Sequence, residues 1–252
     1  MLNWELKYKA DLAYFQLNTL NLDPSIVCLF TIKNSKITPH EDLNNCEFIS
    51  RVLNFPIYFL HQIHSSIIFY VNRDFLPTNL YHGDGLYTDR KNIFLAVRVA
   101  DCLPIYFFVP QRSIIGIVHA GWRGTLGLIA LKLAWQMMNK FHLSPNEIYY
   151  AFGSAIGECC YEIKSDVLLQ YKTLLQNYDI NGGIRNDAGK IFLNLKKINE
   201  TVLNKNGFIK YADLSLCTYC QERYFYSYRR GDRNLYNWSL IGYITSEFNK
   251  FS

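Results

Sequence analysis

The central part of the chain contains short apolar segments separated by turn residues, and this pattern limits the possible folds more than any other feature. The segments are rich in β-branched and aromatic residues, so they predict strands. They cover residues 57–59, 66–71, 92–99, 105–109, 113–118 and 148–152. Pro110, Gln111 and Arg112 separate two of these segments and predict a hairpin turn.

Apolar residues recur at helical spacing in three other segments, which predict helices over residues 126–141, 161–175 and 193–206. Asn206 and Gly207 form a good C-terminal capping signal for the last helix. Helices thus alternate with strands, while the central strands are joined as hairpins. We therefore expect an α/β fold of the layered α+β kind, with mixed β layers flanked by helices, rather than a doubly wound parallel sheet.

The chain shows no internal repeat, low-complexity stretch or long linker, so residues 1–252 are expected to form one domain. The loop at Gly182 and Gly183 is the only place where we would look for a boundary. Half of the residues are hydrophobic and 19% are charged, which is enough apolar surface for a sizeable core and argues against disorder.

Hydrophobicity and charge also limit the compartment and the partners. No run of about 18 apolar residues exists, so no transmembrane helix or membrane partner is expected. Residues 1–15 lack the apolar stretch and cleavage site of a signal peptide, so we expect a cytoplasmic protein. The net charge of +5 is mild, and the only tight basic group is Arg229, Arg230 and Arg233. We interpret that group as a solvated or anion-binding loop and expect no nucleic-acid partner.

Three segments carry residues suited to chemistry. The first is the HQIH stretch with His61 and His64, the second is Ala-Asp-Cys ending at Cys102, and the third runs from His119 to Gly124. On a strand, residues three apart point to opposite faces, so only one of the two first-segment histidines would serve a given site. The third segment ends a strand and enters a helix, where glycines permit close approach and the helix N-terminus can hold an anion.

Taken together, two histidines and a cysteine form a three-ligand metal set with an open fourth position, which is the pattern of catalytic zinc. Cysteine and histidine could also serve as a thiolate nucleophile and its base. Each residue alone also fits a structural role: a buried cysteine, a hydrogen-bonded core histidine, and a tight turn with a packed tryptophan.

The other cysteines give weaker signals. The C-x-x-C stretch of Cys217 and Cys220 has no second ligand pair at the spacing of a structural zinc site. Cys159 and Cys160 are adjacent, which is poor chelate geometry, and we interpret them as structural. The chain has seven cysteines and no secretory signal, so no disulfide framework is expected.

The order of several motifs makes the chain resemble one family. HQIHSS, DGLYTD, VRVADCLPIYF, VHAGWRGT, SAIGECCYEI, IFLNLKKIN, CTYC and FYSYRRGD follow one another as in the YfiH-type family, whose members are labelled laccase-like, polyphenol oxidase or purine nucleoside phosphorylase. The match runs from about His61 to Ile241. The N-terminal region departs from the family, because residues 30–45 lack its Gly-Gly-Val-Ser and SLNLG segments.

The resemblance implies a single α/β domain with β layers between helices, related to the cytotoxic necrotizing factor catalytic domain. It also implies that His64, Cys102 and His119 bind a metal ion, usually zinc. The chain has six histidines, too few for an ordinary multicopper oxidase, although one copper ion could replace zinc. We expect a monomer or a homodimer.

The implied activity is phosphorolysis of adenosine, inosine and S-methyl-5′-thioadenosine to free base and ribose 1-phosphate, with adenosine deamination as a side activity. Arg123 is the candidate phosphate ligand, and Arg51, which matches a family arginine before the first motif, is a second. Asp84 or Asp101 could transfer a proton or orient a metal ligand, beside Cys102 as a catalytic residue.

Two other functions remain open at this point. One is a metal-free cysteine hydrolase or amidase that uses Cys102 and His119. The other is a non-enzymatic binding module that keeps the fold, in which these residues could be replaced without consequence. Metal content and substrate profiling distinguish the three hypotheses.

Overall fold

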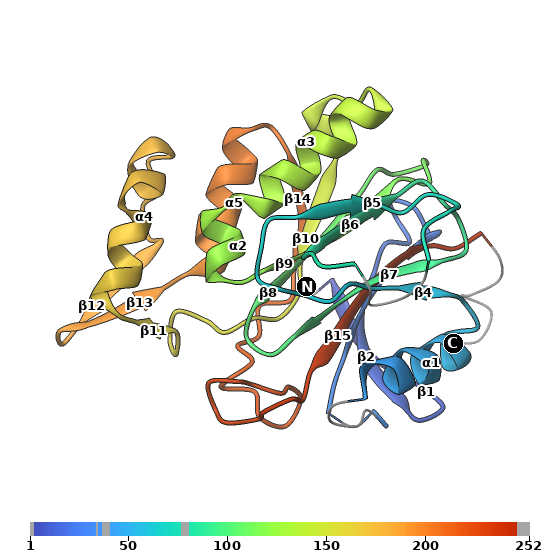
Figure 1. Cartoon of the computed structure of the whole chain (residues 1–252), viewed down its shortest axis with the longest axis horizontal. Coiled ribbons are helices and arrows are strands. Elements are labelled where there is room, and N and C mark those ends of the chain that lie inside the picture. Colours follow the sequence, from blue (N-terminus) through green and yellow to red (C-terminus); the bar gives the residue numbers. More distant parts are fainter. Residues whose placement is uncertain (1–2, 34, 37–40, 77–80, 246–252) are drawn as a thin grey trace.

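The computed structural model describes residues 3–33, 35–36, 41–76 and 81–245. Two six-stranded sheets face each other between helices (Figure 1). The first sheet has the order β1-β2-β3-β15-β7-β4 and is antiparallel except where β4 joins β7. Its strands are β1 (Trp4–Lys9), β2 (Leu12–Leu17), β3 (Ile26–Thr31), β15 (Asn237–Tyr243), β7 (Phe94–Val99) and β4 (Ile57–Tyr58).

The second sheet has the order β14-β10-β8-β9-β6-β5, with parallel pairing at both ends. Its strands are β14 (Ile209–Asp213), β10 (Tyr149–Phe152), β8 (Leu103–Phe108), β9 (Ile115–Ala120), β6 (Gly85–Thr88) and β5 (Ile68–Tyr70). The predicted hairpin is confirmed as β8 and β9, which pair antiparallel from Leu103 opposite Ala120 to Phe108 opposite Ile115.

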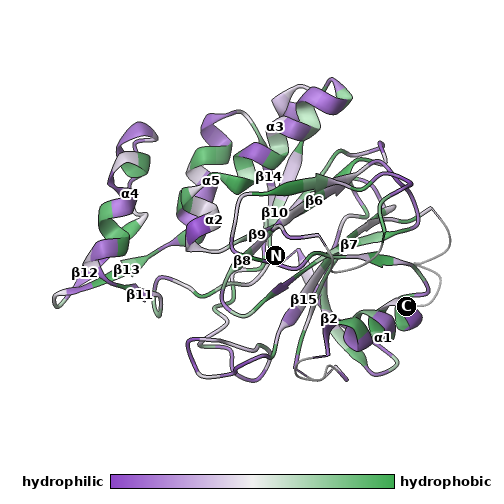
Figure 2. Ribbon diagram, viewed as in Figure 1, coloured by the Kyte–Doolittle hydropathy of each residue, from purple (hydrophilic) through white to green (hydrophobic). Residues whose placement is uncertain are grey.

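The central strands are apolar on both faces because both faces are covered. In β3, Val27 and Leu29 pack beneath helix α1 (Asp42–Leu53), while Cys28 and Phe30 enter the core between the two sheets. Helices α3 (Ile129–Phe141) and α5 (Leu195–Lys205) cover the outer face of the second sheet. The expected layered α/β arrangement is confirmed, and the helices alternate hydrophobic and hydrophilic segments as layer-covering helices do (Figure 2).

A third, small sheet lies apart from the two large ones (Figure 1). It has the order β11-β13-β12 and comprises β11 (Glu162–Ile163), β13 (Lys190–Leu193) and β12 (Ile184–Asp187), with α4 (Ser165–Asn177) between β11 and β12. The predicted loop at residues 181–183 separates α4 from β12 inside this unit.

The predicted helix over residues 126–141 is wrong in one respect, because it is two helices. A short helix, α2 (Trp122–Leu126), is followed by α3, and Leu128 between them has a left-handed φ of 57°. A right-handed helix cannot continue through that conformation. The break lies where the chain passes close to Ser66, whose Cβ would be 3.4 Å from a Cβ added to Gly127.

The other two predicted helices begin later than expected. Residues 162–163 pair with β13, so the second helix starts at Ser165. Leu193 also belongs to β13, and Asn194 caps α5 by accepting a hydrogen bond from the backbone N–H of Lys197. Gly207 beyond that helix has a φ of 84°, as its capping role requires.

Candidate active site

The side chains of His64, Cys102 and His119 converge from three separate places in the fold. His64 lies in the loop after β4, Cys102 directly precedes β8, and His119 is on β9. Their nitrogen and sulfur ligand atoms all lie within 4.8 Å of one another. His119 is buried and His64 is exposed, so the cluster opens to solvent on the His64 side.

The β8–β9 hairpin sets the distance between the cysteine and the buried histidine. Pro104 is opposite His119 in the ladder, which leaves Cys102 at the strand end beside the turn that follows β9. Gly121 in that turn is required for space, because an added Cβ would lie 2.8 Å from Cys102 Sγ and 3.5 Å from His64 Cδ2.

His64 reaches the cluster from a loop, so the strand-based reason for choosing between the two histidines is wrong. Residues 62–65 form no strand, and His64 has a φ of 57°. His61 forms an isolated bridge with His82, and their rings lie 4.8 Å apart. The structure therefore brings His64, and not His61, to the cysteine.

Asp84 fixes two of the three residues. Its fully buried carboxylate lies 2.9 Å from His119 Nδ1 and accepts hydrogen bonds from the backbone N–H groups of His64 at 3.0 Å and Ser65 at 2.6 Å. A histidine that donates from Nδ1 presents Nε2 to the cluster. Asp84 is therefore placed to orient His119 and to hold the His64 loop, which is one of the two roles expected for it.

The side chains of the cluster shift one another's pKa values. Burial alone would raise the pKa of the Cys102 thiol, but the imidazoles of His119 and His64 lower it to about 6. Burial would lower the pKa of His119, yet the Cys102 sulfur and the Asp84 carboxylate raise it to about 9. The thiolate, which is the form of cysteine that binds metals and attacks electrophiles, is thus favoured at neutral pH.

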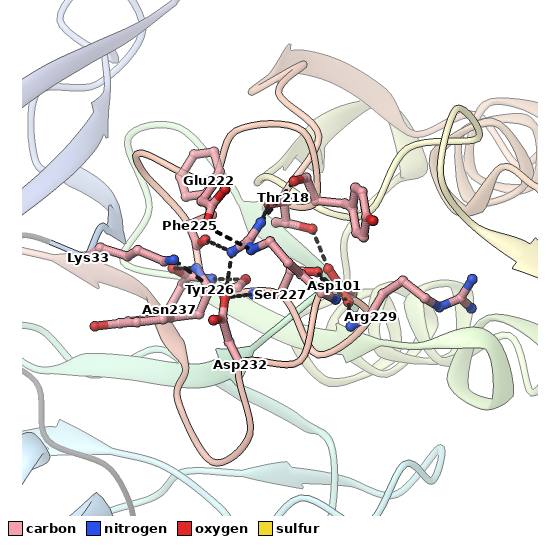
Figure 3. A network of polar contacts seen from close by, with 12 residues as sticks. Lys33, Asp101, Thr218, Glu222, Phe225, Tyr226, Ser227, Arg229, Asp232 and Asn237 are labelled. Carbon is pink, nitrogen blue, oxygen red and sulfur yellow. Dashed lines mark hydrogen bonds and ion pairs between the residues drawn. The ribbon is translucent and has the colours of Figure 1, made fainter.

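Asp101 has a different environment from Asp84. Its buried carboxylate accepts hydrogen bonds from Thr218 Oγ1 at 2.6 Å, Ser227 Oγ at 3.1 Å and the Arg229 backbone N–H at 2.8 Å (Figure 3). Asp101 itself has a left-handed φ of 93°. These three donors occupy both carboxylate oxygens, so the geometry favours a role in holding the 217–230 loop over proton transfer.

A cavity of about 490 Å³ surrounds the cluster. Besides the three cluster residues, its walls contain three arginines and four aromatic side chains. They are Arg98, Arg123, Arg229, Trp122, Tyr161, Tyr228 and Tyr236. A cavity of this size with aromatic walls and a few placed charges is typical of a small-molecule site.

The three arginines differ in how much of their charge is neutralised. Arg98 forms an ion pair with Asp42 at the start of α1. Arg123 stacks over the ring of Trp122 at 4.2 Å, and Arg229 donates to the backbone carbonyls of Cys160 and Glu162. Within the described residues neither of the last two has a carboxylate partner, so both can neutralise a bound anion.

The predicted second phosphate ligand, Arg51, lies elsewhere. It is exposed in the last turn of α1, a helix packed on the first sheet, and it does not line the cavity. The helix after His119, α2, has only five residues and contributes little dipole, so anion binding at this position would depend on the Arg123 side chain.

Sequence reasoning missed Arg98 and the aromatic wall. Arg98 lies within the VRVADC motif, close to Cys102, and Tyr228 lies within FYSYRRGD. Their position inside these motifs is the one sequence feature that could have indicated a place in the site. Their side-chain direction depends on the packing of β7 and the 217–230 loop, which the sequence does not reveal.

A second group of cysteines contradicts one part of the sequence interpretation. Cys217 and Cys220 have a second pair beside them, namely Cys159 and Cys160, whose adjacency predicts poor chelate geometry. The four sulfur atoms instead lie within 4.8 Å of one another. The spacing rule failed because the second pair comes from a distant loop and consists of adjacent residues.

Within the described ranges, no helix is both long and apolar enough to cross a bilayer.

Comparison with known proteins shows that the chain resembles the members of one family. The family described as multi-copper polyphenol oxidoreductase laccase matches residues 38–242. A protein of Borreliella burgdorferi named purine nucleoside phosphorylase is 33% identical over 187 residues, which cover 74% of this chain and 79% of that protein.

Purine nucleoside phosphorylase YlmD of Geobacillus stearothermophilus is 38% identical over 151 residues, or 58% of this chain. The matched part spans about half the length of that relative, 54%. The crystal structure of YlmD from the same organism superposes with a TM-score of 0.82 at 29% identity, covering 95% of this chain and 98% of the other. A Bacillus licheniformis structure titled hypothetical protein YfiH gives a TM-score of 0.79 at 29% identity, covering 94% and 98%.

Proposed function

The chain belongs to the multi-copper polyphenol oxidoreductase laccase family, and we propose that it is a purine nucleoside phosphorylase that uses the His64–Cys102–His119 cavity. In this proposal one domain, residues 1–252, releases the free base from adenosine, inosine and S-methyl-5′-thioadenosine. Phosphate is the second substrate, and ribose 1-phosphate, or its methylthio derivative, is the second product. Adenosine deamination is proposed as a side activity of the same site.

The donor set fits a single metal ion. Two imidazole nitrogens and one thiolate suit zinc, and the same set accepts copper. The hydrogen bond from His119 to Asp84 provides the outer-shell support that metal-ligating histidines usually have. When bound there, the ion supplies a Lewis acid with an open coordination position. Two histidines in the cluster are too few for the multicopper chemistry in the family's name.

The cavity walls provide partners for both substrates. Arg123 and Arg229 carry charges that suit phosphate, and a guanidinium can bind phosphate through two parallel hydrogen bonds. Trp122, Tyr161 and Tyr228 offer flat apolar surfaces on which a purine can stack. In the reaction a phosphate oxygen attacks C1′ of the ribose while the bond from C1′ to N9 of the purine breaks. The leaving base takes up a proton, which balances the one that hydrogen phosphate gives up when it forms the ester. Positioning of the anion next to the sugar supplies much of the catalysis.

The observation that carries this proposal is that Arg123 and Arg229, which have no carboxylate partner among the described residues, share one cavity with the cluster. The test is an assay of inosine, adenosine and S-methyl-5′-thioadenosine with and without phosphate, using protein of known metal content. We expect release of hypoxanthine from inosine to require phosphate and to produce an equal amount of ribose 1-phosphate. Base release that does not depend on phosphate and yields free ribose would overturn the phosphorylase proposal.

One observation also favours the metal-free cysteine hydrolase. The lowered pKa of Cys102 and the adjacent His119 match a thiolate nucleophile with its base. Removal of metal by a chelator, followed by an activity assay, distinguishes the two. The phosphorylase and deaminase activities should fall with metal content and return with added zinc, whereas a cysteine hydrolase should keep its activity and lose it to a thiol-alkylating reagent.

A further inference from the structure

Four cysteines lie together at the edge of the second large sheet, away from the three ligands of the candidate active site. Strands β10 and β14 are parallel neighbours, so the segments that follow them leave the sheet at the same end, where both strands have their C-terminal residues. Cys159 and Cys160 follow β10, and Cys217 and Cys220 follow β14. The topology, rather than sequence spacing, therefore places the two pairs side by side.

The distances between the sulfur atoms approach those around one tetrahedral ion. Zinc–thiolate bonds of about 2.3 Å place the sulfurs of a tetrahedral site about 3.8 Å apart. Cys220 Sγ lies 3.7 Å from Cys159 Sγ and 3.3 Å from Cys160 Sγ, and all four sulfurs lie within 4.8 Å of one another. Only small side-chain adjustments separate this arrangement from a coordination shell.

Backbone contacts hold the two segments in place. The Thr218 N–H donates to the Ala155 carbonyl at 3.1 Å, beside an isolated bridge between Ala155 and Cys217. The Gly157 N–H donates to Cys217 Sγ at 3.2 Å, an interaction that favours a thiolate. An added Cβ on Gly157 would lie 3.1 Å from Cys159 Sγ, so glycine at this position leaves room for the sulfur.

We propose that Cys159, Cys160, Cys217 and Cys220 bind one Zn²⁺ ion as a structural tetrathiolate site, separate from the candidate active site. On binding, each thiol releases its proton to solvent and each sulfur forms one bond to the ion. No electron transfer is involved. Four protein ligands leave no open position, which is the pattern of structural rather than catalytic zinc.

The surroundings suit the negative charge of four thiolates around a divalent ion. Arg230 donates to the carbonyls of Thr218 and Tyr219, which lie between the two cysteines of the second pair, at 3.0 and 2.8 Å. Arg229 donates to the carbonyl of Cys160 at 3.4 Å. The Arg229 guanidinium therefore lies near the cluster and offsets part of its charge, whereas Arg230 also pairs with Asp232 and mainly holds the backbone of the loop.

The proposed ion would support one wall of the candidate active site. Thr218 lies between the two cysteines of the second pair and donates to the Asp101 carboxylate, which also accepts the Arg229 backbone N–H (Figure 3). Asp101 directly precedes Cys102, and Arg229 lines the cavity. A fixed 217–220 loop thus holds both the metal-bearing strand end and one of the cavity arginines.

A disulfide is the competing outcome, since Cys160 and Cys220 are within reach of one another. A disulfide would join two of the sulfurs at about 2.05 Å and leave two free thiols. It gives no reason for all four sulfurs to converge, whereas one ion does. Intact mass measured under denaturing, non-reducing conditions distinguishes the two, because a disulfide removes two hydrogens from the chain.

The test is metal analysis of variants that remove one site at a time. We expect about two zinc ions per wild-type chain, about one in Cys102→Ser, about one in Cys220→Ser and about none in the double variant. Cys46→Ala, which removes a buried cysteine of α1, is the matched control and should keep about two. Circular dichroism checks that each variant folds.

A spectroscopic measurement keeps the proposal testable if Cys220→Ser does not fold. Reconstitution of Cys102→Ser with Co²⁺ should give the intense sulfur-to-cobalt absorption of a tetrahedral thiolate site, and zinc should displace it. A chain with one zinc that is lost entirely in Cys102→Ser would overturn the proposal. So would a mass two hydrogens lower with no cobalt spectrum.

Discussion

The carboxylate of Asp84 and the imidazole of His119 lie 2.9 Å apart, and both side chains are buried. The same carboxylate accepts the backbone N–H groups of His64 and Ser65. One side chain therefore orients one ligand and holds the loop of another. Cys102 is positioned separately, by the β8–β9 hairpin and the space at Gly121.

Asp84→Asn tests this positioning role. An amide removes the charge and can accept from His119 through only one oxygen, so we expect metal affinity to fall roughly 10- to 100-fold. Competition with a chromophoric chelator measures the change. Asp89→Asn, which alters an exposed aspartate beyond the same strand, should leave metal affinity unchanged. Equal affinity in Asp84→Asn and wild type would show that the hydrogen bond does not support the site.

His64→Ala and His61→Ala test the choice between the two histidines. The structure places only His64 with Cys102 and His119, while His61 lies against His82. We expect His64→Ala to lose most of the metal held at this site, and His61→Ala to keep it. Metal analysis in a Cys220→Ser background removes any contribution from the other cysteines. Comparable loss in both variants would contradict the placement of the loop.

Gly121→Ala tests the space around the thiolate. The φ of Gly121 is −69°, which alanine can adopt, so the backbone should tolerate the change. The added Cβ would lie 2.8 Å from Cys102 Sγ and force that sulfur to move. We expect a folded protein with strongly reduced metal content and activity. Gly127→Ala, whose nearest contact would be 3.3 Å, is the control, and equal metal content in both variants would refute the steric argument.

Much of the fold follows from local pattern. The runs in β8 and β9 are apolar because both sheet faces are covered, so both strands could be predicted from the sequence, although their predicted bounds, 105–109 and 113–118, differ from the observed Leu103–Phe108 and Ile115–Ala120. The break between α2 and α3 could not, because Leu128 has no helix-breaking character. Its left-handed backbone occurs next to Gly127, where an added Cβ would lie 3.4 Å from Ser66 Cβ. Helix boundaries at β11 and β13 likewise depend on pairing between distant segments.

The candidate site, too, could be predicted only in part from the sequence. Motif order pointed to His64, Cys102 and His119, which the structure brings together. The role of Asp84 depends on contacts with a loop about 20 residues earlier in the chain, and the sequence offered it only as one of two aspartates. The cysteine cluster depends on the parallel pairing of β10 with β14, and neither strand carries a local sign of its partner.

The 217–230 loop makes a pH-dependent contribution to stability through Asp232. Burial alone would raise the pKa of Asp232, but the Ser227 N–H, Arg230 and Lys33 lower it below the ordinary 3.8. A lowered folded-state pKa stabilises the fold above pH 3.8, and this contribution is lost as the pH falls through the folded value. Asp232→Asn should cost roughly 1–3 kcal/mol at pH 7.

Urea unfolding at pH 7 and near pH 3 measures this effect. The difference between wild type and Asp232→Asn should shrink at the lower pH, which lies below the ordinary 3.8, so that the unfolded chain takes up a proton at this carboxyl. Asp187→Asn, which breaks an exposed pair with Arg185, should change stability by less than about 1 kcal/mol at either pH. A constant difference at both pH values would show that the charge of Asp232 does not matter.

Arg123→Ala should separate the two proposed activities. Phosphorolysis consumes an anion, while deamination of adenosine consumes water, so only the first needs a guanidinium clamp. Loss of one charge-assisted hydrogen bond costs roughly 1.5–3 kcal/mol, or about one to two decades in rate. We expect phosphorolysis of inosine to fall by that factor, with a raised KM for phosphate, while phosphate-independent deamination falls less.

Two further variants decide how the anion is held. Arg51→Ala, on α1 and outside the cavity, should leave both activities and the KM for phosphate unchanged. Arg229→Ala should resemble Arg123→Ala if the two guanidinium groups bind the same phosphate, because both line the cavity without a carboxylate partner among the described residues. A different result would be equal loss of phosphorolysis and deamination in Arg123→Ala, with metal content intact. That result would show that the stacking of Arg123 on Trp122 supports the site as a whole, and the phosphate would then be assigned to Arg229.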